Sequence, residues 1–489
     1  MHRLALAAAL TAAPLSAQDT IPLPDTTAAP TADWNVEQTF GPTETVRFTT
    51  DEVTWSNIDI SPDGRTLVFD VLGDLYTMPI EGGQATRITS GAAFDMQPRF
   101  SPDGDWIAYT SDRGGMNNVW VVRPDGSDAR QVSEEQSRDV NSPTWMPDGD
   151  YILARKHFVE RRSLGAGEIW MYHVRGTGTG LQVTERTSWQ KDTGEPDVSP
   201  DGEWVYFSRD VTPGETFEYN KDPYGVIYAI LRRNLRTGEQ ETVTRRPGGS
   251  ITPRVSPDGT KLAFIRRARL ESVLFLRDLA TGEEWPVFDR LDKDLQEAWA
   301  IHGVYPQYDW HPDGRDIVIW GEGKFWRVDT TTGEDREIPF SADVEQRIHQ
   351  ALRYRVEVEP ETFPVRMLRD VATSPDSRHV AYSALGQIHV KRLPNGDVRR
   401  VTDDDRLEFD PSFSPDGERL VYTTWTDQEG GRVRVVRTDG SDGRDIVALP
   451  GHYIEPSFSP DGRMVVYRRT DGGEIRGRIY GERTGLYVV

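Results

Sequence analysis

The sequence of 489 residues contains no cysteine. This absence excludes disulfide bonds, thiolate catalysis and cysteine-based zinc sites. After the first residues, no stretch approaches the ~20 consecutive apolar residues that a membrane-spanning helix needs. Positive charge is also scarce, because 57 Lys and Arg face 79 Asp and Glu and the formal net charge is −22. Such a charge disfavours binding to nucleic acid and to anionic membranes.

The N-terminal residues have the composition of an export signal. Arg3 is followed by a short apolar stretch that ends in the small residue Ala17. This pattern predicts a Sec-type signal peptide over residues 1–17, and a linker rich in Pro, Thr and Ala over residues 18–40. We therefore expect a periplasmic or secreted protein without a membrane span.

One short motif recurs along the rest of the chain. In Ser101-Pro102-Asp103-Gly104, the proline presets φ for a type I turn and the glycine accepts a positive φ after it. Runs of alternating apolar residues flank the motif, as expected for a β-hairpin. Related turns occur at Ser61–Gly64, Ser101–Gly104, Met146–Gly149, Ser199–Gly202, Ser256–Gly259, His311–Gly314, Ser374–Ser377, Ser414–Gly417 and Ser459–Gly462.

The spacing of these turns predicts the architecture. Their prolines lie 40 to 63 residues apart, and each period has room for four short strands. Such self-similarity is typical of a β-propeller, so we predict an all-β propeller of four-stranded blades over residues 41–489. The ninth unit stops after its third strand, Leu486–Val489. Either the strand at Thr45–Thr50 completes the last blade, or the chain shown is cut short, or there are two rings with the second incomplete.

The fourth unit contains a long loop, Val211–Gly225, which we expect to lie over one face of the ring, and three further connections are also longer than the others. The first follows the third turn and begins at Arg155. The second is Asp289–Tyr305. The third, Ser341–Arg355, has Val344, Ile348 and Leu352 at helical spacing, which predicts a helical insertion over about 341–355.

The repeats resemble the WD40-like PD40 repeats of TolB and tricorn propellers. The stretches Phe69–Gly83, Gly167–Val174 and Ala298–Pro306 are most similar to the N-terminal propeller of exported bacterial amidohydrolase-family proteins. That resemblance implies a metal-dependent catalytic barrel after the propeller. The barrel and its His-x-His ligand pair have no counterpart in this sequence, so the resemblance supplies no catalytic residue and no metal ligand.

One cluster of basic residues is a candidate binding site. Arg155, Lys156, His157, Arg161 and Arg162 lie within eight positions in an otherwise acidic chain. They can bind an anionic substrate group or an acidic partner surface. The alternative is a solvated loop whose cations pair with neighbouring carboxylates.

A second candidate lies in the connection at Asp289–Tyr305. Trp299, His302 and Tyr305 are expected either to line the mouth of the central channel, where propellers bind ligands, or to pack against a neighbouring blade.

Two functions fit these observations. The first is the non-catalytic, substrate-gating part of a two-domain amidohydrolase, which would act on C–N bonds and whose metal-bearing barrel is missing from this chain. The second is a self-standing TolB-like scaffold that binds a protein or an envelope polymer. In both cases we expect no catalytic residue and no cofactor in this chain, and no nucleic-acid partner. The expected partner is a C-terminal catalytic domain in cis in the first case, and a protein or an envelope polymer in the second.

The turn assignment is testable at Gly104. Valine at a position with positive φ should destabilise its blade by about 1–2 kcal/mol. We expect Gly104→Val to lower the melting temperature, as measured by circular dichroism. An unchanged melting temperature would contradict the turn assignment.

Overall fold

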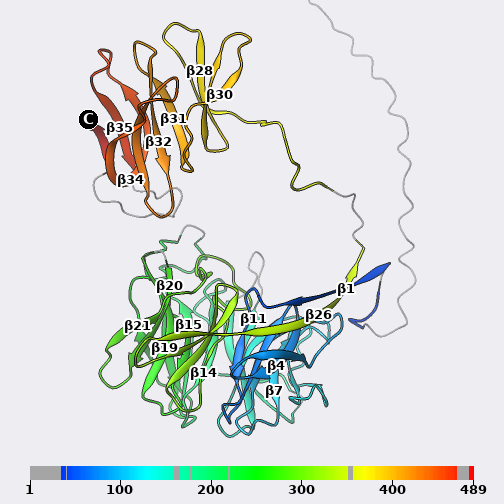
Figure 1. Ribbon diagram of the computed structural model, residues 1–489. Helices are drawn as coiled ribbons and strands as arrows, with labels where there is room; N and C mark the ends of the chain where they lie inside the picture. Colours follow the sequence, from blue (N-terminus) through cyan, green and yellow to red (C-terminus); the bar gives the residue numbers. More distant parts are fainter. Residues whose placement is uncertain are drawn as a thin grey trace, which may run out of the picture.

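The computed structural model describes residues 35–39, 41–158, 166–176, 178–218, 221–269, 271–350, 356–470 and 484–489. These residues form strands joined by turns and loops, and none of them is helical (Figure 1). The predicted signal peptide and most of the predicted linker lie outside the described residues.

The first six turn motifs belong to six four-stranded blades. Within each blade the strands are antiparallel and follow one another in chain order. The strands of blades one to three are β2 (Ile58–Ile60), β3 (Thr66–Val71), β4 (Asp74–Pro79), β5 (Gly83–Arg87), β6 (Asp95–Phe100), β7 (Ile107–Ser111), β8 (Asn118–Val122), β9 (Arg130–Gln131), β10 (Val140–Trp145), β11 (Tyr151–Phe158), β12 (Ala166–His173) and β13 (Leu181–Gln182). Those of blades four to six are β14 (Thr193–Val198), β15 (Trp204–Asp210), β16 (Tyr228–Asn234), β17 (Gln240–Thr244), β18 (Ile251–Val255), β19 (Lys261–Ala268), β20 (Glu271–Asp278), β21 (Glu284–Phe288), β22 (Asp309–Trp310), β23 (Asp316–Gly321), β24 (Lys324–Asp329) and β25 (Asp335–Ile338).

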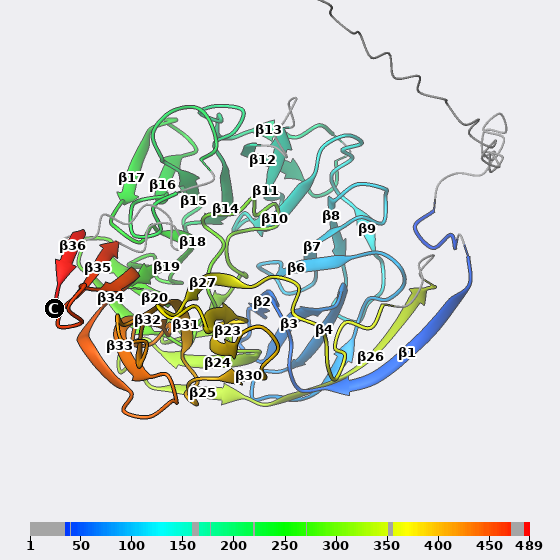
Figure 2. The same cartoon turned by 90° about the horizontal axis from the view of Figure 1, so that it is seen from above.

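The six blades are arranged in a ring around a common axis, along which their first strands lie (Figure 2). The first strand of each blade contacts the first strand of the next, from β2 through β6, β10, β14 and β18 to β22, and β22 contacts β2 again. Six blades therefore close a ring. Its interior is packed by apolar side chains between neighbouring sheets, the largest group joining blades five, six and one.

The turns have the predicted geometry. Gly104 has a φ of +75°. The Ser101 hydroxyl donates to Asp103 Oδ1 at 2.5 Å and accepts from the Trp106 backbone N–H at 2.9 Å. The same serine–aspartate hydrogen bond recurs in the other Ser-Pro-Asp turns, for example from Ser199 to Asp201. The motif is a structural element repeated with the blades.

Two direct hydrogen bonds close the ring between blade six and blade one. The Ile58 N–H donates to the Gln307 carbonyl at 2.9 Å, and the Gln307 N–H donates to Asn57 Oδ1 at 2.9 Å. Trp320 Nε1 of blade six also donates to the carbonyl of Val53, which precedes blade one, at 2.8 Å. All of these groups are buried, and we call this junction between blade six and blade one the seam.

A two-stranded ribbon crosses the outside of this seam. Strand β26 (Phe340–His349) leaves blade six and pairs in parallel with β5 of blade one, and β1 (Thr43–Thr50) pairs antiparallel with β26. The prediction that Thr45–Thr50 completes the last blade is wrong. Those residues lie in β1, at the edge of the sheet that contains blade one.

The predicted helical insertion is also wrong for its described part. Residues 341–349 belong to β26, and residues 351–355 lie outside the described residues. Burial alternates with the period of a strand: Phe340, Ala342 and Val344 are buried, whereas Ile348 is 46% exposed. The spacing of Val344 and Ile348 fits a strand as well as a helix, because positions four apart also share one face of a strand.

The last three turn motifs belong to a second set of sheets, which follows residues 356–368. Its strands are β27 (Arg369–Thr373), β28 (His379–Ala384), β29 (Gln387–Arg392), β30 (Val398–Arg400), β31 (Leu407–Phe413), β32 (Arg419–Trp425), β33 (Gly431–Arg437), β34 (Arg444–Phe458), β35 (Val465–Thr470) and β36 (Gly485–Val488). Within the described residues, these strands pair only with one another. The nine repeats thus divide into a closed ring of six and an open set of three.

The ribbon offers a test that distinguishes a strand from a helix. Val344→Ala removes a buried side chain that packs against the core of blade one, and should lower the free energy of unfolding by about 2 kcal/mol. Ile348→Ala is the matched control and should change it by less than about 0.5 kcal/mol. Urea unfolding followed by tryptophan fluorescence measures both. Equal losses would contradict the strand assignment.

Candidate functional site

The connection between β21 and β22 enters the central channel. Hydrogen bonds link it to residues at the inner strands of five blades, namely Asn57, Gln97, Asn141, Glu195 and Gly248. Because the inner strands surround the channel, a segment that contacts five of them lies inside it. We call residues 294–304 the plug segment.

Ion pairs anchor the start of the plug segment to blade five. Arg267 on β19 contacts Asp294 Oδ1 through Nη2 and Glu297 Oε1 through Nη1, both at 2.5 Å. Ser272 Oγ donates to Asp294 Oδ2 at 2.7 Å. Asp294 and Arg267 are both buried, so removal of one partner would leave an uncompensated charge.

The middle of the plug segment is held through its backbone carbonyls. Arg155 Nη1 donates to the carbonyls of Ala300 and Ile301 at 3.1 and 3.0 Å, and Asn141 Nδ2 donates to the Ile301 carbonyl at 2.9 Å. The His157 Nε2 atom lies 3.1 Å from the same Ile301 oxygen. The same Nε2 also lies 3.2 Å from the Asn141 amide nitrogen, so the tautomer of His157 decides which of the two contacts is a hydrogen bond. Burial and the neighbouring Arg155 lower the pKa of His157 well below its usual value, so the ring stays neutral.

Two more carbonyls are bound on either side of this point. Lys221 Nζ lies 3.3 Å from the Gln296 carbonyl, and Gln97 Nε2 donates to the His302 carbonyl at 2.6 Å. The plug segment is therefore bound at four carbonyls by side chains from blades two, three and four.

A buried carboxylate binds the end of the plug segment. Glu195 on β14 accepts from the Val304 N–H at 2.6 Å through Oε1, and from the Ser208 hydroxyl at 2.6 Å through Oε2. Burial raises the pKa of Glu195, and the hydrogen bonds oppose this shift. The same Oε2 accepts from the Thr252 N–H of the next blade, so this residue connects two blades and the plug segment.

Three cationic side chains of the channel wall, Arg155, Lys191 and Lys221, are each paired with a carboxylate. Arg155 forms an ion pair with Asp192. Lys191 and Lys221 lie 3.6 and 3.2 Å from the two carboxylate oxygens of Asp210. All three cationic side chains are nearly completely buried.

The structure places the predicted basic patch differently from a surface loop. Arg155, Lys156 and His157 lie on β11 and are at most 3% exposed. Arg161 and Arg162 lie outside the described residues. The three described residues do not share one environment, since Arg155 and His157 contact the plug segment while Lys156 points elsewhere.

Lys156 belongs to a separate cluster. It forms an ion pair with Glu135, and its Nζ lies 4.1 Å from the ring centre of Trp170. These contacts stabilise the charge of Lys156 outside the channel.

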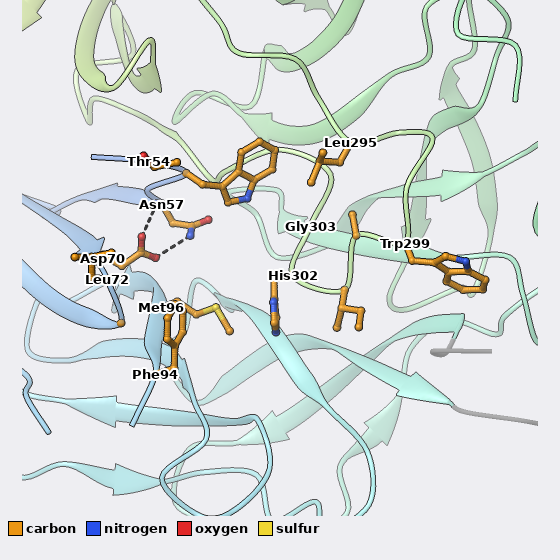
Figure 3. A pocket seen from close by; sticks show the side chains of 14 residues that line it. Thr54, Asn57, Asp70, Leu72, Phe94, Met96, Leu295, Trp299, His302 and Gly303 are labelled. Carbon is orange, nitrogen blue, oxygen red and sulfur yellow. Dashed lines mark hydrogen bonds between the residues drawn. The ribbon is translucent and has the colours of Figure 1, made fainter. Parts of the chain in front are cut away.

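The three predicted residues of the long connection divide between pocket and core. The Trp299 ring stacks on Phe217 with centres 4.2 Å apart. His302 Nε2 lies 3.2 Å from the Asn117 amide, and its side chain faces an open pocket (Figure 3). Trp299 lines the same pocket.

Tyr305 takes the other of the two expected roles. It is 1% exposed and packs against Trp55 and Trp320, and its hydroxyl donates to the Trp320 carbonyl at 3.0 Å. It packs in the seam between blade six and blade one.

The pocket has a volume of about 510 Å³ and lies between blade one, blade two and the plug segment. Its apolar walls face polar groups, which is typical of ligand sites. It is lined by Thr54, Trp55, Asn57, Asp70, Leu72, Gly73, Phe94, Met96, Leu295, Trp299, Ala300, Ile301, His302 and Gly303. Figure 3 shows Phe94 and Met96 side by side, next to the hydrogen-bonded Asp70 and Asn57.

Asp70 is the buried acid of this pocket. Its carboxylate accepts from the Asn57 N–H at 3.0 Å, the Asn57 amide at 2.8 Å and the Gln97 N–H at 2.8 Å. Burial raises its pKa to about 6, although these hydrogen bonds favour the charged form.

The site residues expected from the sequence do not include Gln97, Glu195, Asp70 or Lys221, although the sequence carries a signal for the first two. Gln97 and Glu195 each lie four positions before the first residue of a turn motif and directly before a proline. Both have positive φ, 58° and 56°, at a bulge of the inner strand. A polar residue at this repeated position faces the channel. Asp70 and Lys221 lie at other positions of their blades, and neither precedes a proline at this repeated position.

Metal chemistry gains no support from the described residues. They contain no group of three His, Asp or Glu side chains placed to hold a metal ion. Nor does any helix in the described part of the chain have the length and apolarity to cross a membrane.

Part of the ring is similar to known proteins. Residues 57–166 match the family model of the tricorn protease N-terminal β-propeller domain. An uncharacterized protein of Agrobacterium fabrum is 36% identical over 97 residues, which cover 19% of this chain and 33% of that protein. Tricorn protease homolog 1 of Streptomyces coelicolor is 25% identical over 390 residues, covering 76% of this chain and 32% of that protein.

A TolB-type protein from Agrobacterium tumefaciens is a structural neighbour, with a TM-score of 0.41 and 20% identity, covering 56% of this chain and 96% of that chain. The chain spans about a third of the length of the two curated relatives. With its strands, ring and repeats, the chain is an all-β protein that contains a six-bladed propeller.

The pKa of Asp70 predicts a pH dependence of stability. In the unfolded chain Asp70 titrates near 3.8, and in the folded ring near 6. The folded state therefore binds the proton more tightly, and the Asp70 contribution to stability falls as the pH rises from about 4 to about 6. We expect Asp70→Asn to flatten the curve of urea midpoint against pH in this window.

Asp63→Asn is the control, because the pKa of this exposed turn carboxyl is lowered by its hydrogen bond from Ser61. It should leave the slope between pH 4 and 6 unchanged. If Asp70→Asn shows the parent slope, the shifted titration belongs to another group.

Proposed function

We propose that this chain is a non-catalytic, extracytoplasmic β-propeller that binds an extended polypeptide at its channel mouth and presents it to a hydrolase domain. The pocket of about 510 Å³ carries this proposal, because it combines exposed apolar side chains with polar groups that can bind a peptide backbone. Phe94 and Leu72, at its rim, are 51% and 58% exposed. Exposed apolar groups in a hollow are typical of sites that bind apolar side chains.

The chemistry assigned to the partner domain is hydrolysis of amide C–N bonds. The resemblance to the propeller of amidohydrolase-family proteins supports this class, and so does the name of the Streptomyces relative, a tricorn protease homolog. The present chain covers about a third of that relative, which leaves room for a catalytic domain elsewhere in such proteins.

The signal-like residues 1–17 support an extracytoplasmic location for this activity. There the ring would meet unfolded or partly degraded polypeptides. The acidic surface, with a net charge of −22, would keep such a protein soluble without attracting anionic envelope polymers.

A binding measurement tests the proposal. Reduced, carboxymethylated lactalbumin, an unfolded polypeptide, is labelled with fluorescein and titrated with the chain, and anisotropy gives the Kd. We expect Phe94→Ala to raise the Kd about tenfold, which corresponds to about 1.4 kcal/mol for one apolar anchor.

Phe48→Ala is the matched control, because Phe48 is similarly exposed, at 44%, but lies on β1 outside the pocket. It should leave the Kd unchanged, and mass spectrometry should find the polypeptide intact after incubation. Cleavage of the polypeptide by this chain would contradict the proposal. Failure to bind would favour the alternative, a scaffold for a folded protein partner.

A further inference from the structure

The plug segment is held mainly through groups that every peptide shares. Four of its carbonyls, those of Gln296, Ala300, Ile301 and His302, accept hydrogen bonds from side chains of the ring. Backbone hydrogen bonds give affinity for an extended chain without fixing its sequence. The wall of the channel therefore has the donors that a foreign peptide would need.

The side chains at the tip of the plug segment, residues 298–303, contribute less than its backbone carbonyls. Ala298 and His302 are exposed, and Ala300 and Ile301 are only partly buried. Trp299, stacked on Phe217, is the single aromatic anchor of the segment. A peptide with one aromatic residue and small neighbours would reproduce these contacts.

The plug segment is fixed by buried side chains at its two ends and by its backbone carbonyls between them. Asp294 at the start is buried and paired with Arg267. Val304 and Tyr305 at the other end are 4% and 1% exposed.

The wall also has hydrogen-bonding capacity that the plug segment does not use. Nε of Arg155 and Nδ1 of His157 are buried without a hydrogen-bond partner. Both side chains are at most 3% exposed and belong to the wall that contacts Ala300 and Ile301. His157 faces the plug segment through Nε2 and Arg155 through Nη1, so neither unpartnered atom is directed at the plug segment. Arg155 Nε lies beside Gly167 and Gly194.

We propose that the wall formed by Gln97, Asn141, Arg155, His157 and Lys221 is a binding site for an extended peptide, occupied here by the tip of the plug segment as an internal, displaceable ligand. The inference rests on the proposed function, since it names where and how the polypeptide binds beyond the mouth pocket. The incoming peptide takes over the carbonyl contacts and the Phe217 ring, and the tip moves out of the channel.

The test uses a fluorescein-labelled synthetic peptide with the sequence of residues 295–304. In one variant, residues 298–303 are replaced by Gly-Ser-Gly, which removes the tip and keeps both anchors. We expect the peptide to bind this variant at least tenfold more tightly than the unaltered chain. In the shortened background, Arg155→Gln should weaken binding at least tenfold, whereas Arg175→Gln, an exposed arginine outside the channel, should not.

A second measurement covers the case in which the shortened chain does not fold. Because the sequence contains no cysteine, Ala300→Cys introduces a single thiol at the tip. We expect saturating peptide to increase the rate at which maleimide alkylates this thiol at least threefold, as the tip leaves the wall. An unchanged rate would overturn the inference.

The two proposals fail differently. Suppose that labelled lactalbumin binds the unaltered chain and depends on Phe94, but the peptide gains nothing from the shortened tip and does not speed alkylation of the Ala300→Cys variant. In that case the mouth pocket binds and the plug segment is a fixed part of the ring. If neither ligand binds, both proposals are rejected.

Discussion

The inner strand of nearly every blade is bent at one fixed point, and both the ring and its binding wall depend on that bend. Gln97, Ser142, Glu195 and Thr252 each have a positive φ between 52° and 58° and stand before a proline. Such a conformation costs a non-glycine residue about 1 kcal/mol or more. The bend turns the residue's N–H toward the preceding blade, where Asp70 accepts from Gln97, Gln97 from Ser142, and Glu195 from Thr252. These bonds offset the strain, and the same bend points polar side chains into the channel.

The open set of three repeats follows the same rule. The Asp410 N–H donates to Asp370 at 3.3 Å, and the Glu455 N–H donates to Asp410 at 3.0 Å, with positive φ at all three residues. The hydrogen bond from one blade to the next is therefore a property of the repeat, independent of ring closure. Closure itself needs contacts that the repeat does not encode, such as those of Gln307 with Asn57 and Ile58.

This distinction explains what could be predicted from the sequence. The Ser-Pro-Asp-Gly turns and the four-stranded units depend on local chemistry, and they are found where the motif places them. The division of nine repeats into six and three depends on the seam at Gln307 and on β26, whose partners lie some 250 residues away in the chain. The helix expected over 341–355 failed because a spacing of four residues is shared by both kinds of element. The basic residues Arg155 and His157 were recognised, but their burial under the plug segment depends on Ile301, 144 residues beyond His157.

The two ends of the channel differ in a way that limits how a peptide can use it. Two residues before the turns, the inner strands carry Asp59, Arg99, Asp197, Arg254 and Asp309 at equivalent positions, deeper than the bend. Arg99 pairs with Asp59 at 2.6 Å, and Arg254 lies 3.3 Å from Asp197, with both arginines buried. Breaking a buried pair leaves an uncompensated charge and costs about 3–5 kcal/mol, more than one backbone hydrogen bond returns. A peptide bound at the plug wall would therefore enter and leave through the mouth beside Phe94, and a hydrolase domain would have to act on that face of the ring.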